Sequence, residues 1–158
     1  MGNIFAASEV VEIGIQIEKN GRDFYGVLAT QAKSPKAKDI FKYLAEQEEK
    51  HITVFQNILD KTDKYEPQGL DADQYYAYMN ALASESVFTK ENKGKEIAQK
   101  IKNDKEAIEI GIGGERDSIV FYEGMKKVVP EYGQKIIDEV IAQEQGHLKQ
   151  LLDLKISL

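Results

Sequence analysis

The amino-acid sequence predicts an all-α protein in which four long helices form two antiparallel hairpins joined by a long crossover. Apolar residues recur at helical spacing along most of the 158-residue chain, with charged residues between them. Two of the three prolines stand at short breaks between such segments, where proline can open a helix. A segment of the first half also recurs in the second half, and an internal repeat of this kind indicates a duplicated helical unit.

Composition limits the classes of function. The chain has the length of a single domain, residues 1–158, contains no cysteine and carries a net charge of −6. Without cysteine there can be no disulfide, zinc–thiolate site or iron–sulfur cluster, so a metal must be held by carboxylate and imidazole groups. The acidic balance argues against a nucleic-acid partner, because phosphate binding needs a basic surface. With no secretory signal and no run of eighteen apolar residues, we expect a cytoplasmic protein without membrane spans.

The first hairpin is predicted from two long amphipathic segments. Residues 4–33 and 35–61 both carry apolar side chains at helical spacing. Between them, Pro35 disfavours a helical conformation at Ser34 and can occupy the first position of the next helix. Because this connection is so short, the two helices should be antiparallel neighbours.

The sequence predicts a long crossover with a short helix, followed by a second hairpin. An aromatic-rich helix is predicted at residues 71–86, and Asn92-Lys93-Gly94 breaks the pattern again. A connection of this length is too long for a simple helical hairpin, so it should run along the bundle. The third long helix is predicted at residues 104–128, and Pro130 opens a fourth at residues 130–154.

The two histidines of the chain occur in the same motif. Each is preceded by a glutamate three residues earlier, as Glu48 before His51 and Glu144 before His147. Residues three apart share a face of a helix, so each pair could bind one metal ion. A single Glu-x-x-His is more often a solvated helical pair, but its duplication favours a metal site.

The internal repeat adds two more carboxylates. Segment 12–25 and segment 109–122 align without a gap and are identical at half of their fourteen positions, and each contains one central glutamate, Glu18 or Glu115. At 1.5 Å per residue, Glu18 lies roughly 24 Å before the first hairpin turn and Glu48 roughly 20 Å after it. The second hairpin gives the same result, so four carboxylates and two imidazoles should meet at one level of the bundle.

Charge then predicts the number of metal ions. Four buried glutamates would repel one another and would lose their hydration, which raises their pKa values. Two divalent cations would balance four carboxylates and two neutral histidines. One glutamate from each of two helices and Glu-x-x-His from each of the other two is the ligand set of di-iron and di-manganese carboxylate bundles. We therefore expect two metal ions, either Fe(II) or Mn(II), rather than a closed structural zinc site.

With these motifs, the chain resembles the rubrerythrin family of the ferritin-like di-iron carboxylate superfamily. The resemblance covers the four long helices and implies a ferritin-like four-helix bundle. It also implies two bridging carboxylates, two terminal carboxylates and one histidine on each metal; these six are Glu48 and Glu144, Glu18 and Glu115, and His51 and His147. Ser118 stands where rubrerythrins usually carry an extra glutamate, and the rubredoxin module that many of them possess is missing.

The resemblance implies an oxidoreductase that reduces hydrogen peroxide or dioxygen. The electrons would come from an external donor such as a rubredoxin-like protein, and the family and the size of the chain suggest a homodimer. The alternative is a ferroxidase or iron-storage protein, in which the same site oxidises Fe(II). A third interpretation is a structural bundle whose Glu/His set is a relic, which the burial of four charges disfavours.

Outside the metal-binding set, two tyrosines are the candidates for a supporting role. Tyr25 and Tyr122 each lie seven residues after a ligand glutamate, which places them on the same helix stripe. Their hydroxyls could therefore hydrogen-bond a ligand carboxylate. The alternative is aromatic packing in the core. Glycines inside the predicted helices, such as Gly21 and Gly114, would let helices approach closely or leave room for an oxidant.

Overall fold

The structure is a computed structural model that describes residues 7–62 and 72–158. Its elements, in chain order, are α1 (Ala7–Gln31), α2 (Pro35–Asp60), α3 (Ala72–Glu85), the 3₁₀ turn η1 (Val87–Thr89), α4 (Lys93–Lys100), α5 (Asp104–Met125), the 3₁₀ turn η2 (Lys126–Val128) and α6 (Glu131–Ser157). The all-α class is confirmed.

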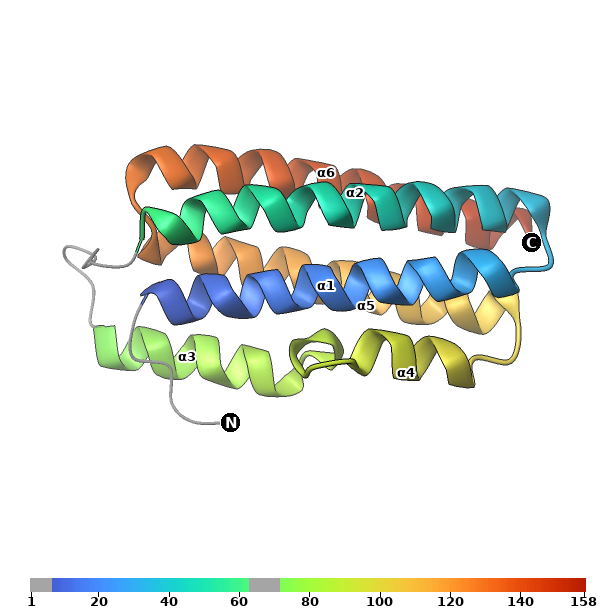
Figure 1. Ribbon diagram of the computed structural model, residues 1–158, viewed down its shortest axis with the longest axis horizontal. Coiled ribbons are helices and arrows are strands. Elements are labelled where there is room, and N and C mark those ends of the chain that lie inside the picture. The colour runs from blue at the N-terminus through green and yellow to red at the C-terminus, as the bar shows by residue number, and fades with distance from the viewer. Residues whose placement is uncertain (1–6, 63–71) are drawn as a thin grey trace.

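The four long helices form the predicted bundle. Helices α1 and α2 make one antiparallel hairpin, and α5 and α6 make the other. Helix α1 packs beside α5 and helix α2 beside α6, so that α1 and α5 form one layer and α2 and α6 the other. The crossover, with α3, η1 and α4, runs along the outer side of the α1 and α5 layer (Figure 1). Two helical hairpins joined by a long crossover are thus confirmed.

Local chemistry explains the first hairpin turn. Ser34 is the N-cap of α2, and its side chain accepts a hydrogen bond from the backbone N–H of Ala37 at 3.3 Å. Pro35 occupies the first helical position, as predicted. The carboxylate of Asp104, at the start of α5, accepts a hydrogen bond from the backbone N–H of Ser34 at 2.8 Å. This contact fixes the end of the first hairpin against the beginning of the second.

The helix bounds depart from the sequence prediction by a few residues. Helix α1 ends at Gln31, before the predicted 33, while the predicted start at residue 4 lies outside the described residues, as does residue 71. Helix α5 ends at Met125 and continues to Val128 as a 3₁₀ turn. Helix α6 extends to Ser157, beyond the predicted 154.

The crossover contains a helix that the sequence analysis did not predict. Asn92 has a left-handed backbone, with φ of 61°, and therefore interrupts the chain as expected. It is also the N-cap of α4, which begins at the next residue, Lys93. Helix α4 packs on α1. An eight-residue segment is short for a periodicity argument, and its stability comes from this tertiary contact.

Pro130 also differs from its predicted role. It is the N-cap of α6, with a ψ of 158°, and the helix begins at Glu131. As is usual for an N-cap residue, its carbonyl accepts backbone hydrogen bonds from Gly133 and Gln134 in the first turn of the helix. Among the described helices, none combines the length and apolar character needed to cross a lipid bilayer.

Candidate metal centre

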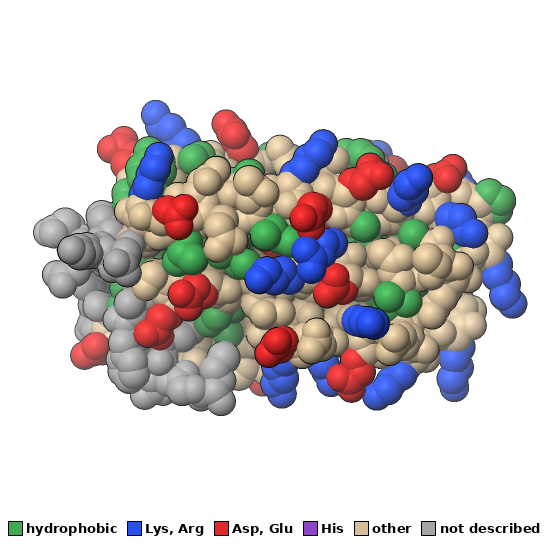
Figure 2. Space-filling view, in the orientation of Figure 1, with side chains coloured by type: hydrophobic (Ala, Val, Ile, Leu, Met, Phe, Trp, Pro, Cys, Tyr) green, Lys and Arg blue, Asp and Glu red, His purple; other side chains and the backbone are tan. Residues whose placement is uncertain are grey.

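All six side chains of the predicted ligand set meet in the middle of the bundle. Helix α1 provides Glu18, helix α2 provides Glu48 and His51, helix α5 provides Glu115, and helix α6 provides Glu144 and His147. Each of the six is at most 3% exposed. No histidine is visible on the molecular face in Figure 2, where acidic and basic side chains are interspersed.

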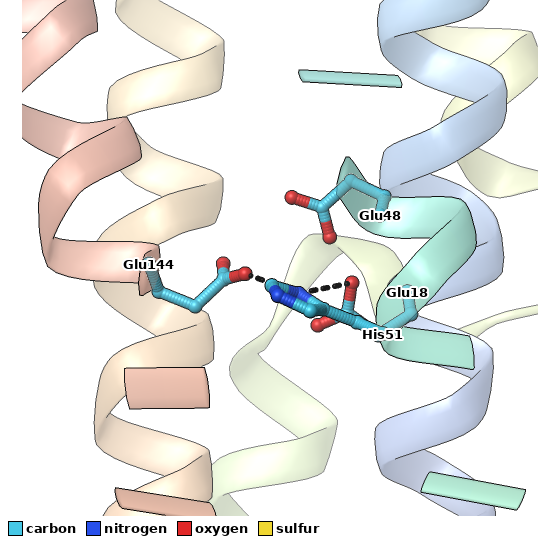
Figure 3. A group of neighbouring side chains, drawn as sticks. All are labelled: Glu18, Glu48, His51 and Glu144. Carbon is cyan, nitrogen blue, oxygen red and sulfur yellow. Dashed lines mark ion pairs between the residues drawn. The ribbon is translucent and has the colours of Figure 1, made fainter. Parts of the chain in front are cut away.

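The six residues form two groups that share two carboxylates. One group consists of Glu18, Glu48, His51 and Glu144, and Figure 3 shows these side chains pointing toward one another. The other consists of Glu48, Glu115, Glu144 and His147. Within each group the candidate donor atoms lie within 4.8 Å of one another, close enough to hold a metal ion. Because Glu48 and Glu144 belong to both groups, the two positions are adjacent.

The buried polar atoms of the six side chains are better suited to coordinate a metal ion than to hydrogen-bond one another. With the glutamates ionised and the histidines neutral, each of the six side chains has one buried nitrogen or oxygen atom without a hydrogen-bond partner: Glu18 Oε2, Glu48 Oε1, His51 Nδ1, Glu115 Oε2, Glu144 Oε1 and His147 Nδ1. Buried polar atoms are rarely left in this state, because each costs about 1–3 kcal/mol. Carboxylate oxygens and imidazole nitrogens together are a donor set that suits iron or manganese. Two cations at these positions would supply all six atoms with partners.

Both imidazoles direct Nδ1 toward the carboxylates. The Nδ1 atom of His51 lies 2.8 Å from Glu144 Oε1 and 3.4 Å from Glu18 Oε2 (Figure 3). Its other nitrogen, Nε2, lies 2.6 Å from the amide oxygen of Gln143. Since an amide oxygen only accepts, Nε2 carries a hydrogen and Nδ1 can present a lone pair to a cation.

The tyrosines hydrogen-bond carboxylates across the two hairpins. The hydroxyl of Tyr25, on α1, donates to Glu115 on α5 at 2.8 Å, and the hydroxyl of Tyr122, on α5, donates to Glu18 on α1 at 2.7 Å. Both tyrosines are buried, at 2% and 0% exposure. Each hydroxyl occupies Oε1 of its glutamate and leaves Oε2 without a partner, and it thereby orients the carboxylate.

The pKa values show how unfavourable the cluster is without a cation. Burial, together with the neighbouring carboxylates, raises the pKa values of Glu48 and Glu115 well above the ordinary value. Burial would also raise the pKa of Glu18, but hydrogen bonding with Glu48 and His51 lowers it overall. Burial alone would lower the pKa of His51, yet Glu144 and Glu18 raise it to about 11. The raised pKa values of Glu48, Glu115 and His51 favour the protonated forms of these groups in the metal-free protein, and two divalent cations would replace those protons.

Comparison with known proteins agrees with this geometry. A family model described as rubrerythrin matches residues 9–155, which is nearly the whole chain. The chain belongs to the rubrerythrin family. Among solved structures, this rubrerythrin-family protein is similar to a Thermotoga maritima protein described as a ferritin-like diiron-carboxylate protein, with a TM-score of 0.72 and 26% sequence identity. The match covers 98% of this chain and 97% of the other. None of the curated proteins matches the chain.

Two further residues of this family member, Ser118 and Gln143, lie beside the candidate ligands. Ser118, where an extra glutamate was expected from the family, is buried, and its hydroxyl donates to the carbonyl of Gly114 at 2.9 Å. Gln143, which hydrogen-bonds His51, was missed by the sequence analysis. The repeat contained a signal for it, because Gln47 and Gln143 each stand directly before the glutamate of a Glu-x-x-His motif.

Proposed function

We propose that the protein binds two iron ions and reduces hydrogen peroxide or dioxygen with electrons from an external donor. The observation that supports this most is the sharing of Glu48 and Glu144 by two adjacent groups of carboxylates and imidazole. Such sharing is what a dinuclear site requires, whereas a single structural ion needs only one closed set of ligands.

The ligand roles follow from the same grouping. Glu48 and Glu144 would bridge the two ions, because they belong to both groups. Glu18 and His51 would complete one position, and the corresponding pair from the second hairpin, Glu115 and His147, would complete the other. Iron is favoured by the mixture of carboxylate and imidazole donors, and manganese is the alternative.

Reduction of one peroxide consumes two electrons and two protons and yields two water molecules. When bound, two iron ions would supply the two electrons, one each. Tyr25 and Tyr122 would hold the terminal carboxylates in place through their hydrogen bonds, and Gln143 would hold the His51 ring. Bulk water is largely excluded, because the six candidate ligands are at most 3% exposed. Because the chain has no cysteine, it cannot hold an iron–sulfur or rubredoxin-type centre of its own. An external one-electron donor protein would therefore restore the reduced state.

Anaerobic reconstitution tests the proposal. Protein loaded with Fe(II) should retain about two irons per chain and should be oxidised by one equivalent of peroxide, with repeated turnover once a reduced rubredoxin is added. The matched control is Glu109→Gln, which changes an exposed glutamate that pairs with Lys155 and should bind iron normally. Iron content far below one per chain would refute the site. Bound iron that reacts with dioxygen but not peroxide would indicate an oxygen reductase, and uptake of many irons per chain would indicate a storage protein.

A further inference from the structure

Among the described residues, two cavities border the candidate metal centre on opposite layers of the bundle. One, of about 200 Å³, is on the α2 and α6 layer and is lined by Tyr43, Gln47, Gln143, Gly146, His147 and Gln150. The other, of about 10 Å³, is on the α1 and α5 layer, under the crossover. Only the small cavity is bordered by candidate carboxylate ligands, namely Glu48, Glu115 and Glu144. A molecule in the large cavity would meet the His147 ring instead.

Small residues on α1 and α5 leave space for the small cavity. Gly21 on α1 and Ser118 on α5 stand at the same repeat position, three residues after Glu18 and Glu115, and both line the cavity. A volume of about 10 Å³ is the space that roughly one water-sized molecule needs. Larger side chains at these two positions would fill it.

Phe88 covers the cavity from the crossover side. This side chain belongs to η1, is 4% exposed and packs on Phe24 with ring centroids 5.1 Å apart. It also lies directly on Gly114, where an added Cβ would come within 2.7 Å of the Phe88 ring. The ring can take this position because residue 114 has no side chain.

Asn20 holds the backbone that carries Phe88. Its buried amide nitrogen donates to the carbonyls of Phe88 at 2.5 Å and Lys90 at 2.7 Å, and its amide oxygen accepts from the N–H of Gly94 at 3.0 Å. A Cβ at Gly94 would lie 2.0 Å from the Asn20 carbonyl oxygen, so only glycine fits there. Asp117 occupies the same repeat position in the second hairpin.

We propose that Phe88 controls access of a small oxidant to the carboxylate side of the metal centre, and that Asn20 is the positioning residue that holds it there. The ligand class is a molecule of two or three heavy atoms, such as hydrogen peroxide, dioxygen or the azide anion. The resting cavity of about 10 Å³ holds about one water-sized molecule, so a small oxidant enters only when the Phe88 ring moves aside, and a bulky hydroperoxide would need a much wider opening. This inference rests on the proposed function, since it assigns the place where the oxidant arrives.

Azide binding to the oxidised, iron-loaded protein tests the inference without turnover. Association followed by the azide-to-iron absorption band should be at least about tenfold faster in Phe88→Ala and about threefold faster in Asn20→Ala. The rate of oxidation by tert-butyl hydroperoxide, relative to hydrogen peroxide, should rise about tenfold in Phe88→Ala. The matched control is Asp117→Asn, which changes the repeat partner of Asn20 and should leave azide association unaltered.

Phe88→Leu is the second variant if Phe88→Ala fails to fold. Circular dichroism verifies the fold of each protein, and elemental analysis verifies its iron content.

The outcomes separate this inference from the proposed function. Equal azide rates in the wild type, Phe88→Ala and Phe88→Leu, with two irons bound, would overturn the role of Phe88 and leave the di-iron site standing. Slower association in Gly146→Leu, without any effect of Phe88→Ala, would show that small molecules arrive through the large cavity, and this too would overturn the inference. Gly146 suits the purpose because no atom lies within 4 Å of a Cβ added there. A wild-type protein that binds no iron would refute both proposals.

Discussion

The two hairpins provide the same candidate ligand residues, but the contacts of these residues differ between the hairpins. In the first, His51 Nδ1 lies 2.8 Å from Glu144 and 3.4 Å from Glu18, and the pKa of His51 is raised to about 11. In the second, His147 Nδ1 lies no closer than 3.5 Å to any carboxylate. Burial lowers the pKa of His147, and the nearby Glu115 does not compensate.

The two glutamates of the internal repeat, Glu18 and Glu115, also differ in their pKa values. The pKa of Glu18 is lowered and that of Glu115 is raised well above the ordinary value, although both are buried and both accept a tyrosine hydrogen bond. A hydrogen bond with Glu48, and then the His51 imidazole, lower the pKa of Glu18, whereas the hydrogen bond of Glu115 with Glu144 raises the pKa of Glu115. Duplication of sequence therefore reproduces the positions of the side chains but not their charge states, which depend on differences of less than 1 Å between the two halves.

The largest expected effect distinguishes shared from terminal carboxylates. Glu144→Ala removes a ligand from both proposed positions, so iron content should fall from about two per chain to well below one. Glu115→Ala removes a ligand from one position only and should retain about one iron. Elemental analysis of both variants, reconstituted in parallel, measures the difference. Equal iron content in the two variants would contradict the bridging role of Glu144.

The two histidines should differ in their effect on the metal-free protein. His51→Ala removes the cation that pairs with Glu144 and Glu18, and it should lower the free energy of unfolding by about 3 kcal/mol. His147→Ala removes a neutral ring and should cost about 1–2 kcal/mol. Urea unfolding in the presence of a chelator measures both. If His147→Ala costs as much, the asymmetry between the hairpins is absent in solution.

The metal-free protein should lose stability as pH rises. Glu48, Glu115 and His51 have raised pKa values, so the folded state binds more protons than the unfolded state above the ordinary carboxyl pKa of 4.5. Stability then falls with pH, for the carboxyls above 4.5 and for His51 between 6.5 and about 11. The lowered pKa values of Glu18 and His147 make stability rise with pH, but only these two groups oppose the three named above, whose pKa values are raised.

Thermal unfolding between pH 5 and pH 8 measures this dependence. The melting temperature of the metal-free protein should decrease by several degrees across this range. The iron-loaded protein should show the reverse trend, because protons compete with metal for the same atoms. A metal-free protein that becomes more stable toward pH 8 would show that the carboxylates are ionised and separated in solution.

The crossed tyrosines offer a finer comparison. Tyr122→Phe removes a hydrogen bond to Glu18, whose lowered pKa keeps it charged, and it should cost about 2 kcal/mol in the metal-free protein. Tyr25→Phe removes the bond to Glu115, whose raised pKa favours its neutral form, and should cost about 1 kcal/mol. With iron bound, both glutamates are charged and the two costs should become equal. Urea unfolding with and without iron tests the change.

Two adjacent glycines of the second hairpin should respond with opposite signs. Gly113→Ala places a Cβ where no atom lies within 4 Å, and it should stabilise α5 by about 0.5–1 kcal/mol through helix propensity. Gly114→Ala brings a Cβ within 2.7 Å of the Phe88 ring and should destabilise by about 1–2 kcal/mol. Chemical denaturation of the single variants decides the signs. A stabilised Gly114→Ala protein would mean that Phe88 does not rest on this residue.

The sequence alone determined which residues share a helix face and how far each lies from a hairpin turn. The rise per residue is the same in every α-helix, so Glu18 and Glu48 could be placed at one level without coordinates. The repeat then implied that Glu115 and Glu144 would meet in the same way. For the same reason the fold class and the composition of the six-residue cluster were predictable.

Only the tertiary structure decided what lies between elements that are distant in the chain. Helix α4, the contact of Asn20 with Phe88 and the partner of each tyrosine depend on how the crossover and the second hairpin pack on α1. Charge states are also outside the reach of a periodic pattern, because the energy of two buried charges changes steeply with separations of a few tenths of an ångström. Helical periodicity is a local property, whereas these contacts arise from the packing of the whole chain.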